Sequence, residues 1–299
     1  MKIAVTGGLG FLGKHIISAL SESGHDVTLF ARREEDLCHG IYFVYADLME
    51  PGDWQAKLAE HDIVINLVGV NLFQRWNKKI KKIIYDSRII STANIINSFA
   101  VGKSKGKTLI NASAVGYYGL RGDEIVTESA EPGSDFLSKV CSDWEKEALK
   151  GESINLRIVL LRLGSVFGSD GGAFPLLAKN YKLMLGGKLG NGRQWFPWIH
   201  VDDVVGIVLK AAADKKMSGA YNCSAPGIVT NGDFTKIMGK VSKRPVLIPF
   251  IPGFVLRIVL GEFGSFLIGG QRAVPDRLQK EGYRFMFPEL KGALEDLLK

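Results

Sequence analysis

The most informative stretch of this sequence is Lys2-Ile3-Ala4-Val5-Thr6-Gly7-Gly8-Leu9-Gly10-Phe11-Leu12-Gly13. A short apolar run, typical of a strand, leads into a GxxGxxG pattern formed by Gly7, Gly10 and Gly13, and a helical pattern follows. This order places backbone N–H groups and a helix N-terminus where a pyrophosphate can bind. A side chain at Gly10 would occupy the space that the phosphates need. We therefore expect a dinucleotide site that includes Phe11 and Leu12; a glycine-rich turn that serves packing only is the alternative.

The following residues continue to alternate between strand and helix. Short runs rich in Val, Ile and Leu predict strands over residues 2–6, 26–31, 41–45, 62–68, 107–112 and 156–163. Amphipathic patterns predict helices over residues 11–23, 53–60, 76–99 and 135–149. This alternation is typical of a parallel sheet with helices on both faces. The predicted fold class is α/β, with a Rossmann-like doubly wound parallel sheet.

Composition and charge narrow the class of protein. The chain has 299 residues, 46% of them hydrophobic and 23% charged, which excludes disordered and collagen-like chains. Its net charge of +7 fits an anionic ligand, and we expect neither nucleic acid nor membrane as a partner. The cysteines Cys38, Cys141 and Cys223 lie far apart, which indicates a reducing compartment and no disulfide framework. We expect a cytoplasmic protein without a metal site.

The end of the second predicted strand indicates which dinucleotide binds. A site that prefers NAD carries an acidic residue there for the ribose 2′-OH. Here Ala31 takes that position, and Arg32 and Arg33 follow. Guanidinium groups pair well with a 2′-phosphate, so the sequence favours NADP(H) over NAD(H). The alternative is that both arginines are solvated loop residues.

Two further segments are candidates for cofactor contacts. Asp47 and Leu48 follow the third predicted strand, where the carboxylate could accept from the adenine amino group or simply cap a turn. Asn66-Leu67-Val68-Gly69 ends the fourth predicted strand. Its small residues suit a backbone that lies close to the ribose.

Beyond residue 165 the pattern becomes rich in glycine and in short elements. We expect residues 1–165, with a return segment over 200–223, to form an NADP-binding Rossmann-like domain. Residues 166–199 and 224–299 are expected to form a smaller substrate-binding part at the carboxyl edge of the sheet.

With these motifs in view, the chain resembles the extended short-chain dehydrogenase/reductases. The shared motifs include the glycine turn, Asn66-Leu67-Val68-Gly69, Arg162-Leu163-Gly164-Ser165-Val166-Phe167-Gly168, His200-Val201-Asp202-Asp203-Val204 and Tyr221-Asn222. More narrowly it is similar to the atypical subfamily of NAD-dependent epimerase/dehydratase-like proteins that includes the YfcH type. That likeness rests on Arg75-Trp76, Asp86-Ser87-Arg88, residues 111–119, residues 192–200, Arg244-Pro245, Gln271-Arg272-Ala273-Val274-Pro275 and Phe287-Pro288-Glu289-Leu290. The resemblance implies a Rossmann-like domain, NADP(H) and a small C-terminal domain, without supplying a substrate.

The resemblance also implies a catalytic Tyr and Lys at YxxxK on one helix, which this chain lacks. Phe136 and Val140 stand at the aligned positions. The proton donor has moved, the substrate needs none, or the site binds cofactor without turnover. Ser113, with Ala114 as its competitor, matches the family's Ser/Thr position. Tyr117 and Tyr118 follow the fifth strand; they are candidates for a relocated phenol, or pack against the nicotinamide.

A polar and aromatic cluster near residue 195 is the candidate substrate cleft. It consists of Arg193, Gln194, Trp195, Trp198 and His200. Arg193 could clamp an anion and Trp195 could stack on a ring, whereas His200 also suits a structural capping role.

Three functions remain open at this point. The first is an NADP(H)-binding oxidoreductase of the atypical extended type, acting on an unknown small molecule that is anionic or linked to a nucleotide. The second is a nucleotide-sugar epimerase or dehydratase. The third is a non-catalytic NADP(H) sensor or partner-binding protein. The sequence leaves the choice between monomer and homodimer open.

Overall fold

A seven-stranded parallel sheet organises the chain. The computed structural model describes residues 1–35, 40–100 and 104–299, so Cys38 lies outside the described residues. The strand order is β12-β7-β5-β4-β1-β2-β3. In chain order these strands are β1 (Lys2–Thr6), β2 (Asp26–Ala31), β3 (Tyr42–Tyr45), β4 (Ile63–Asn66), β5 (Thr108–Ala114), β7 (Arg157–Leu163) and β12 (Gly219–Cys223). All neighbouring strands in this sheet pair in parallel, which confirms the predicted fold class.

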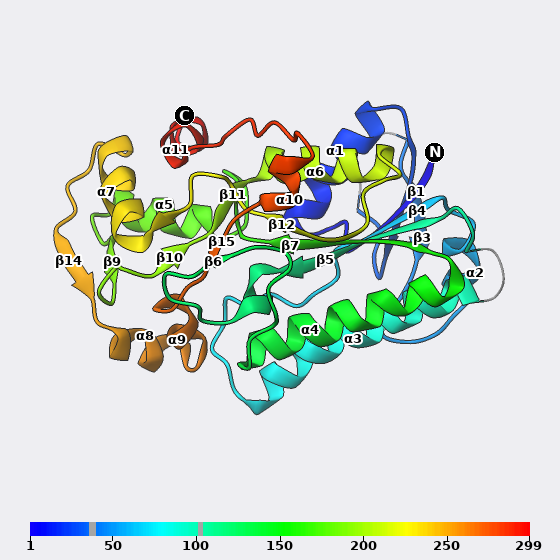
Figure 1. Cartoon of the computed structure of the whole chain (residues 1–299), viewed down its shortest axis with the longest axis horizontal. Coiled ribbons are helices and arrows are strands. Elements are labelled where there is room, and N and C mark those ends of the chain that lie inside the picture. Colours follow the sequence, from blue (N-terminus) through cyan, green and yellow to red (C-terminus); the bar gives the residue numbers. More distant parts are fainter. Residues whose placement is uncertain (36–39, 101–103) are drawn as a thin grey trace.

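Helices cover both faces of the sheet (Figure 1). One face carries α1 (Phe11–Glu22) and α6 (Val201–Ala213), and the other carries α2 (Trp54–Leu58), α3 (Lys78–Ala100) and α4 (Phe136–Leu149). Each layer has its own apolar core, because strands buried on both faces alternate their side chains between the two. Every predicted strand and helix coincides with one of these elements, with ends that differ by one or two residues.

The order of the strands reverses between β1 and β4. The chain builds outward from β1 to β3 and then returns to start β4 on the other side of β1. Open α/β sheets bind ligands outside the carboxyl ends of the strands at such a reversal. The glycine turn after β1 and the loop after β4 meet there, so the fold puts the predicted cofactor segments at this point.

The smaller part of the structure lies beyond the carboxyl edge of the sheet. It comprises β8 (Ser165–Phe167), α5 (Phe174–Lys182), β9 (Gly187–Leu189), β10 (Trp195–Phe196), β11 (Trp198–His200), β13 (Val229–Thr230), α7 (Asn231–Val241), β14 (Ile248–Ile251), α8 (Gly253–Leu260), α9 (Phe263–Leu267) and α11 (Leu290–Leu297). The short pair β6 (Ile125–Val126) and β15 (Arg272–Ala273), with α10 (Asp276–Lys280), joins it to the sheet.

This smaller part has an aromatic core of its own. Its buried members include Phe167, Phe174, Trp198 and Phe234. Between β11 and β13 the chain returns through α6 to the sheet, where β12 pairs with β7, as the sequence predicted for residues 200–223. The division into two domains stays a prediction. Among the described residues, no helix combines the length and the apolar character that a membrane span requires.

Candidate functional site

The three glycines of the first turn have different physical roles. Gly7 has φ of +73°, and a Cβ there would lie 2.7 Å from the carbonyl carbon of Leu67. A Cβ on Gly13 would lie 2.5 Å from the Cα of Gly8. Both glycines therefore let backbone segments pack closely. A Cβ on Gly10 would meet only the carbonyl oxygen of Gly7, at 3.3 Å, so the space above Gly10 is open as a pyrophosphate requires.

The N-terminus of α1 faces the same open space and carries no side-chain cap. Gly10 is its N-cap, and no side chain among the described residues accepts from the first turn. The backbone N–H groups of Phe11 and Leu12 donate no hydrogen bond within the described chain. Free N–H groups and the helix dipole together attract anions. These residues fit the phosphates of a dinucleotide.

The ring of Phe11 is held by a glycine-rich loop of the smaller part. A Cβ on Gly168 or Gly171 would lie 2.5 or 2.4 Å from carbon atoms of this ring. His15 Nε2 of α1 lies 3.0 Å from Asp170 Oδ1 in the same loop. Residues 168–172 therefore pack against the start of α1 and fix its position.

Positive charge gathers at the end of β2. Arg32 and Arg33 are both exposed, and Arg32 has no partner among the residues that the structure describes. Arg33 Nη2 lies 3.6 Å from Glu35 Oε2, and Lys14 Nζ donates to Glu35 Oε1 at 2.7 Å. The hydrogen bond from Lys14 holds the pKa of Glu35 below its usual value. The sequence analysis missed this carboxylate, which sits among the cations that would meet a 2′-phosphate.

Asp47 and Leu48 differ in how far they can reach a ligand. Asp47 Oδ1 accepts from the N–H of Met49 at 3.1 Å, so the residue closes a turn, as one of the two interpretations held. Its Oδ2 has no partner among the described residues. Leu48 packs in the core beside Trp54, and its side chain has little surface for a ligand.

The side chain of Asn66 positions the loop after β4. It is fully buried, and its Oδ1 accepts from Thr6 Oγ1 at 2.9 Å and from the N–H of Val68 at 3.2 Å. Its Nδ2 donates to Thr92 Oγ1 and Asn111 Oδ1. All of its hydrogen-bonding capacity is used within the protein. The Asn66 side chain therefore has no group left to bind a cofactor. Instead it holds the backbone of Leu67, Val68 and Gly69 in place.

Ser113 and Tyr118 lie inside a buried hydrogen-bond network. Ser113 Oγ donates to Glu145 Oε1 at 2.6 Å. Arg162 donates to both oxygens of the same carboxylate, from Nε to Oε1 at 2.9 Å and from Nη2 to Oε2 at 2.8 Å. Tyr118 is 0% exposed, accepts from Arg162 Nη1 and donates to Asn222 Oδ1 at 2.6 Å. Burial raises the pKa of Tyr118 to about 12. Both hydroxyls are engaged within the protein, which favours a structural role; their catalytic role stays an untested prediction.

Tyr117 has a different environment. Its ring is half-buried, with its centre 3.6 Å from the Arg162 guanidinium carbon. Among the described residues, its hydroxyl interacts with Arg162, the same group that lies against its ring. Burial raises the pKa of Tyr117, and the charge of Arg162 opposes that rise. Among the three predicted catalytic hydroxyls, this one is available to a ligand.

The helix expected to carry the catalytic pair presents a different face from the one predicted. Phe136 and Val140 belong to an apolar cluster with Trp76 and Phe263. The ring centres of Phe136 and Trp76 are 5.4 Å apart. The face of α4 toward Gly116, directly after β5, carries Leu137 and Cys141 instead. Neither pair, Phe136 with Val140 or Leu137 with Cys141, contains a phenol or an ammonium group.

The predicted substrate cluster is divided by the structure. Trp198 is 0% exposed and donates from Nε1 to the carbonyl of Gly227, so it belongs to the aromatic core. His200 is also buried, and its Nδ1 accepts from the N–H of Asp202 as the N-cap of α6. Both are removed from the cleft, because their burial leaves no access for a ligand.

The remaining members of this cluster lie nearer to the surface. Gln194 Nε2 donates to the carbonyls of Leu189 and Leu267. Trp195 donates from Nε1 to Asp123 at 2.8 Å and stacks under Arg272. Arg193 is exposed and its side chain has no partner among the described residues. Arg193 and Trp195 stay candidates for substrate contacts.

Comparison with known proteins now identifies the family. Residues 3–224 match the model described as "NAD dependent epimerase/dehydratase family", and residues 251–297 match a domain of unknown function, DUF1731. The chain belongs to the NAD dependent epimerase/dehydratase family. This confirms the resemblance to the atypical extended short-chain dehydrogenase/reductases.

Relatives of this family match along the whole chain. Epimerase family protein YfhF of Bacillus subtilis is 39% identical, with 100% of this chain and 98% of YfhF covered. The crystal structure of human epimerase family protein SDR39U1 with NADPH superposes with a TM-score of 0.87 at 29% identity, covering 99% of both chains. A nucleoside-diphosphate sugar epimerase from Corynebacterium glutamicum matches at 31% identity and a TM-score of 0.81, over 100% of this chain and 58% of that one.

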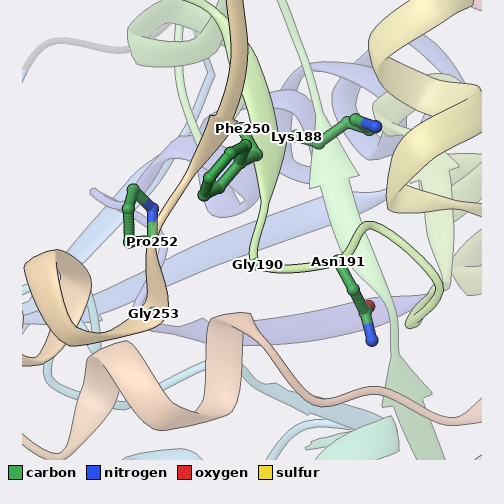
Figure 2. Close-up of a pocket in the computed structure, with 6 residues that line it drawn as sticks. All are labelled: Lys188, Gly190, Asn191, Phe250, Pro252 and Gly253. Carbon is green, nitrogen blue, oxygen red and sulfur yellow. The ribbon is translucent and has the colours of Figure 1, made fainter.

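A separate pocket lies in the smaller part of this epimerase-family chain. It has a volume of about 490 Å³ and is lined by Lys188, Gly190, Asn191, Phe250, Pro252 and Gly253. Figure 2 shows Phe250 and Pro252 on one strand of chain, facing the loop of Gly190 and Asn191. None of the residues predicted for the substrate cleft lines this pocket, although Asn191 Oδ1 accepts from the N–H of Arg193 at 2.9 Å.

Several charged residues of this family member had no role predicted from the sequence. Glu145 and Arg162 are buried, whereas Glu128 and Arg88 are partly buried. Glu128 accepts from the N–H groups of Asn222 and Arg277, and burial raises its pKa. One sequence signal could have predicted the Glu145–Arg162 network. Arg162 lies inside an otherwise apolar strand pattern, and a buried arginine needs a buried partner.

Proposed function

We propose that this chain is an NADP(H)-dependent oxidoreductase of the atypical extended short-chain type. The observation that carries the proposal is the open, uncapped anion site above Gly10, with Arg32 at the end of β2 unpaired among the described residues. Dinucleotide sites in this class need both features: backbone N–H groups for the pyrophosphate and a residue that reads the adenosine ribose.

The preference for NADP(H) rests on charge. The described residues near the end of β2 offer three cations, Arg32, Arg33 and Lys14, against two carboxylates, Glu34 and Glu35, of which Glu35 is paired. A 2′-phosphate would gain charge-assisted hydrogen bonds from these groups, whereas a 2′-hydroxyl gives them nothing comparable. The human relative was crystallised with NADPH, which is consistent with this preference.

The chemistry would be hydride transfer, which the bound dinucleotide supplies. The protein holds the phosphates through the N–H groups of Phe11 and Leu12, and it positions the loop after β4 through Asn66. Tyr117 is placed to give or take the proton that accompanies hydride transfer, because it lies beyond the end of β5 and is less buried than Ser113 and Tyr118. The charge of Arg162 beneath the ring offsets part of the rise that burial causes in the pKa of Tyr117, and so lowers the cost of the phenolate.

The test is a comparison of cofactor affinities by titration calorimetry. NADPH is expected to bind about ten- to a hundred-fold more tightly than NADH, from charge-assisted bonds of about 1.5–3 kcal/mol. Arg32→Ala should remove most of this margin, and Arg244→Ala, on an exposed loop of the smaller part, serves as the matched control. Equal affinities of the wild type for NADPH and NADH would defeat the preference.

The substrate is expected to be a small molecule that carries an anionic group or a nucleotide. The exposed cation of Arg193 and the ring of Trp195 support this, since they can clamp an anion and stack on a base or sugar.

A second function, sensing NADP(H) without turnover, is favoured by one observation: the face of α4 toward Gly116 carries Leu137 and Cys141. NADPH binding without reduction of any carbonyl in a broad panel would select it.

A further inference from the structure

Arg88 places a partly buried cation beneath the loop that follows β4. Its Nη1 donates to the carbonyl of Ile84 at 3.0 Å and its Nη2 to the carbonyl of Val70 at 3.2 Å. The ring of Trp144 on α4 lies over it, 5.2 Å from the guanidinium carbon. No carboxylate of the described residues pairs with it, and Nε donates no hydrogen bond there. The arrangement satisfies two N–H groups and leaves the charge uncompensated.

A guanidinium that is partly withdrawn from water without gaining an anion carries a desolvation cost. An apolar residue of similar volume would pack between α3 and α4 without that cost. The buried carboxylate of Glu145 on α4 cannot balance it, since that group already forms a bidentate pair with Arg162. The charge of Arg88 is therefore left without an anionic partner among the described residues.

The guanidinium lies just under the carboxyl edge of the sheet. A Cβ on Gly69 would lie 2.8 Å from the Cζ and Nη2 atoms of Arg88, so only a glycine backbone covers the cation on that side. Gly69 itself is exposed. This position is on the β4–β5 side of the strand-order reversal, opposite the side where β2 ends in Arg32.

We propose that Arg88 makes this site bind the reduced dinucleotide in preference to the oxidised one. The inference rests on the proposed function: if the adenosine half binds beside Arg32, the nicotinamide half extends past β4 toward β5. The nicotinamide ring carries a positive charge when oxidised and none when reduced. A fixed cation near the ring therefore disfavours the oxidised form, and it does so strongly where water is excluded.

The experiment compares the Kd values of NADPH and NADP⁺ for the same protein by titration calorimetry. Both ligands carry the 2′-phosphate and the pyrophosphate, so contributions from Arg32 and the glycine turn cancel in the ratio. The wild type should bind NADPH at least about ten-fold more tightly than NADP⁺. Arg88→Met should bring the ratio close to one, and Arg88→Lys should keep most of the preference.

Ser87→Ala is the matched control for a purely structural role. Ser87 Oγ accepts from the N–H of Val70 at 3.2 Å, so this variant loosens the same loop while it keeps the charge. It should change both Kd values by the same factor. If Arg88 acted only by holding the loop, Arg88→Met would also change both equally and leave the ratio at the wild-type value.

Two results would overturn the proposal. One is a wild-type ratio near one, which needs no variant and holds even if Arg88→Met fails to fold. The other is an unchanged ratio in folded Arg88→Met. Wild-type protein that binds neither ligand would instead refute the proposed function, on which this inference depends.

Discussion

Glu145 and Arg162 carry opposite charges at positions where each side chain is only 5% exposed. Their bidentate pair is joined by Ser113 on β5 and by Tyr118, which continues the network to Asn222 on β12. Charge-assisted bonds in such a dry setting fix the geometry of the end of the sheet. The network also supports Tyr117, whose ring lies on Arg162.

The network predicts a graded loss of stability. Glu145→Gln leaves the Arg162 cation buried without an anion, so the free energy of unfolding should fall by about 3–5 kcal/mol. Tyr118→Phe removes the hydrogen bonds to Asn222 and Arg162 but leaves no charge unpaired. The free energy of unfolding should fall by about 1–3 kcal/mol. Urea unfolding followed by circular dichroism measures both. A Tyr118→Phe variant of unchanged stability that loses turnover would restore the catalytic role that the structure argues against.

Tyr117 gives the second prediction at this scale. Tyr117→Phe keeps the ring against Arg162 and removes only the hydroxyl, so NADPH affinity should stay unchanged. Turnover of a carbonyl substrate found by screening should fall by about a hundred- to ten-thousand-fold, the usual contribution of a positioned proton donor. Tyr85→Phe is a suitable control, because that hydroxyl bonds to Asp143 on the outside of α4. Full activity of Tyr117→Phe would show that water or the substrate supplies the proton.

At the scale of the elements, two substitutions in the turn between β1 and α1 distinguish a loss of cofactor binding from a loss of stability. Gly10→Val introduces a side chain into open space at a backbone conformation, φ −74° and ψ 166°, that valine adopts readily. This variant should fold and fail to bind NADPH. Gly13→Val is its counterpart: its Cβ would lie 2.5 Å from the Cα of Gly8, so it should lose stability. Calorimetry with NADPH and thermal unfolding distinguish the two, and NADPH binding by folded Gly10→Val would place the cofactor elsewhere.

The elements themselves could be predicted because their patterns are local. Buried parallel strands such as Ile63–Asn66 are short apolar runs, and the glycine turn has its own signature. The face of α4 could not be predicted in this way. Whether Val140 or Cys141 points to the end of β5 depends on how α4 packs on α3 and α9, and one residue rotates a helix face by about 100°. Trp198 and His200 were predicted to line a cleft. Their burial depends on segments distant in the sequence, so the local pattern could not predict it.

The whole molecule should lose stability in mild acid through its buried histidines. Burial lowers the pKa of His61, which accepts or donates at Thr28 Oγ1 and at backbone carbonyls, and burial likewise lowers the pKa of His200. Near neutral pH both states hold neutral rings. As the pH falls below about 6.5, these histidines are protonated in the unfolded chain but stay neutral in the folded chain. The free energy of unfolding therefore falls by at most about 1.4 kcal/mol per pH unit for each group.

Urea unfolding at pH 7.5 and pH 5.5 checks this prediction for His61. The stability advantage of wild type over His61→Gln should shrink at the lower pH, while His25→Gln, on the surface after α1, should follow the wild type at both. An advantage that grows at pH 5.5 would mean that His61 is protonated in the folded protein.

At the scale of the whole molecule, one site is proposed to span the sheet reversal and to bind NADP(H) along it. A crystal structure of this chain with NADPH tests that claim most directly. We expect density for the pyrophosphate at the N–H groups of Phe11 and Leu12, the 2′-phosphate within hydrogen-bond distance of Arg32 or Arg33, and the nicotinamide beyond β4 on the side of Gly69. Density for the dinucleotide in the pocket of Phe250 and Asn191, or a glycine turn left empty at saturating NADPH, would contradict it.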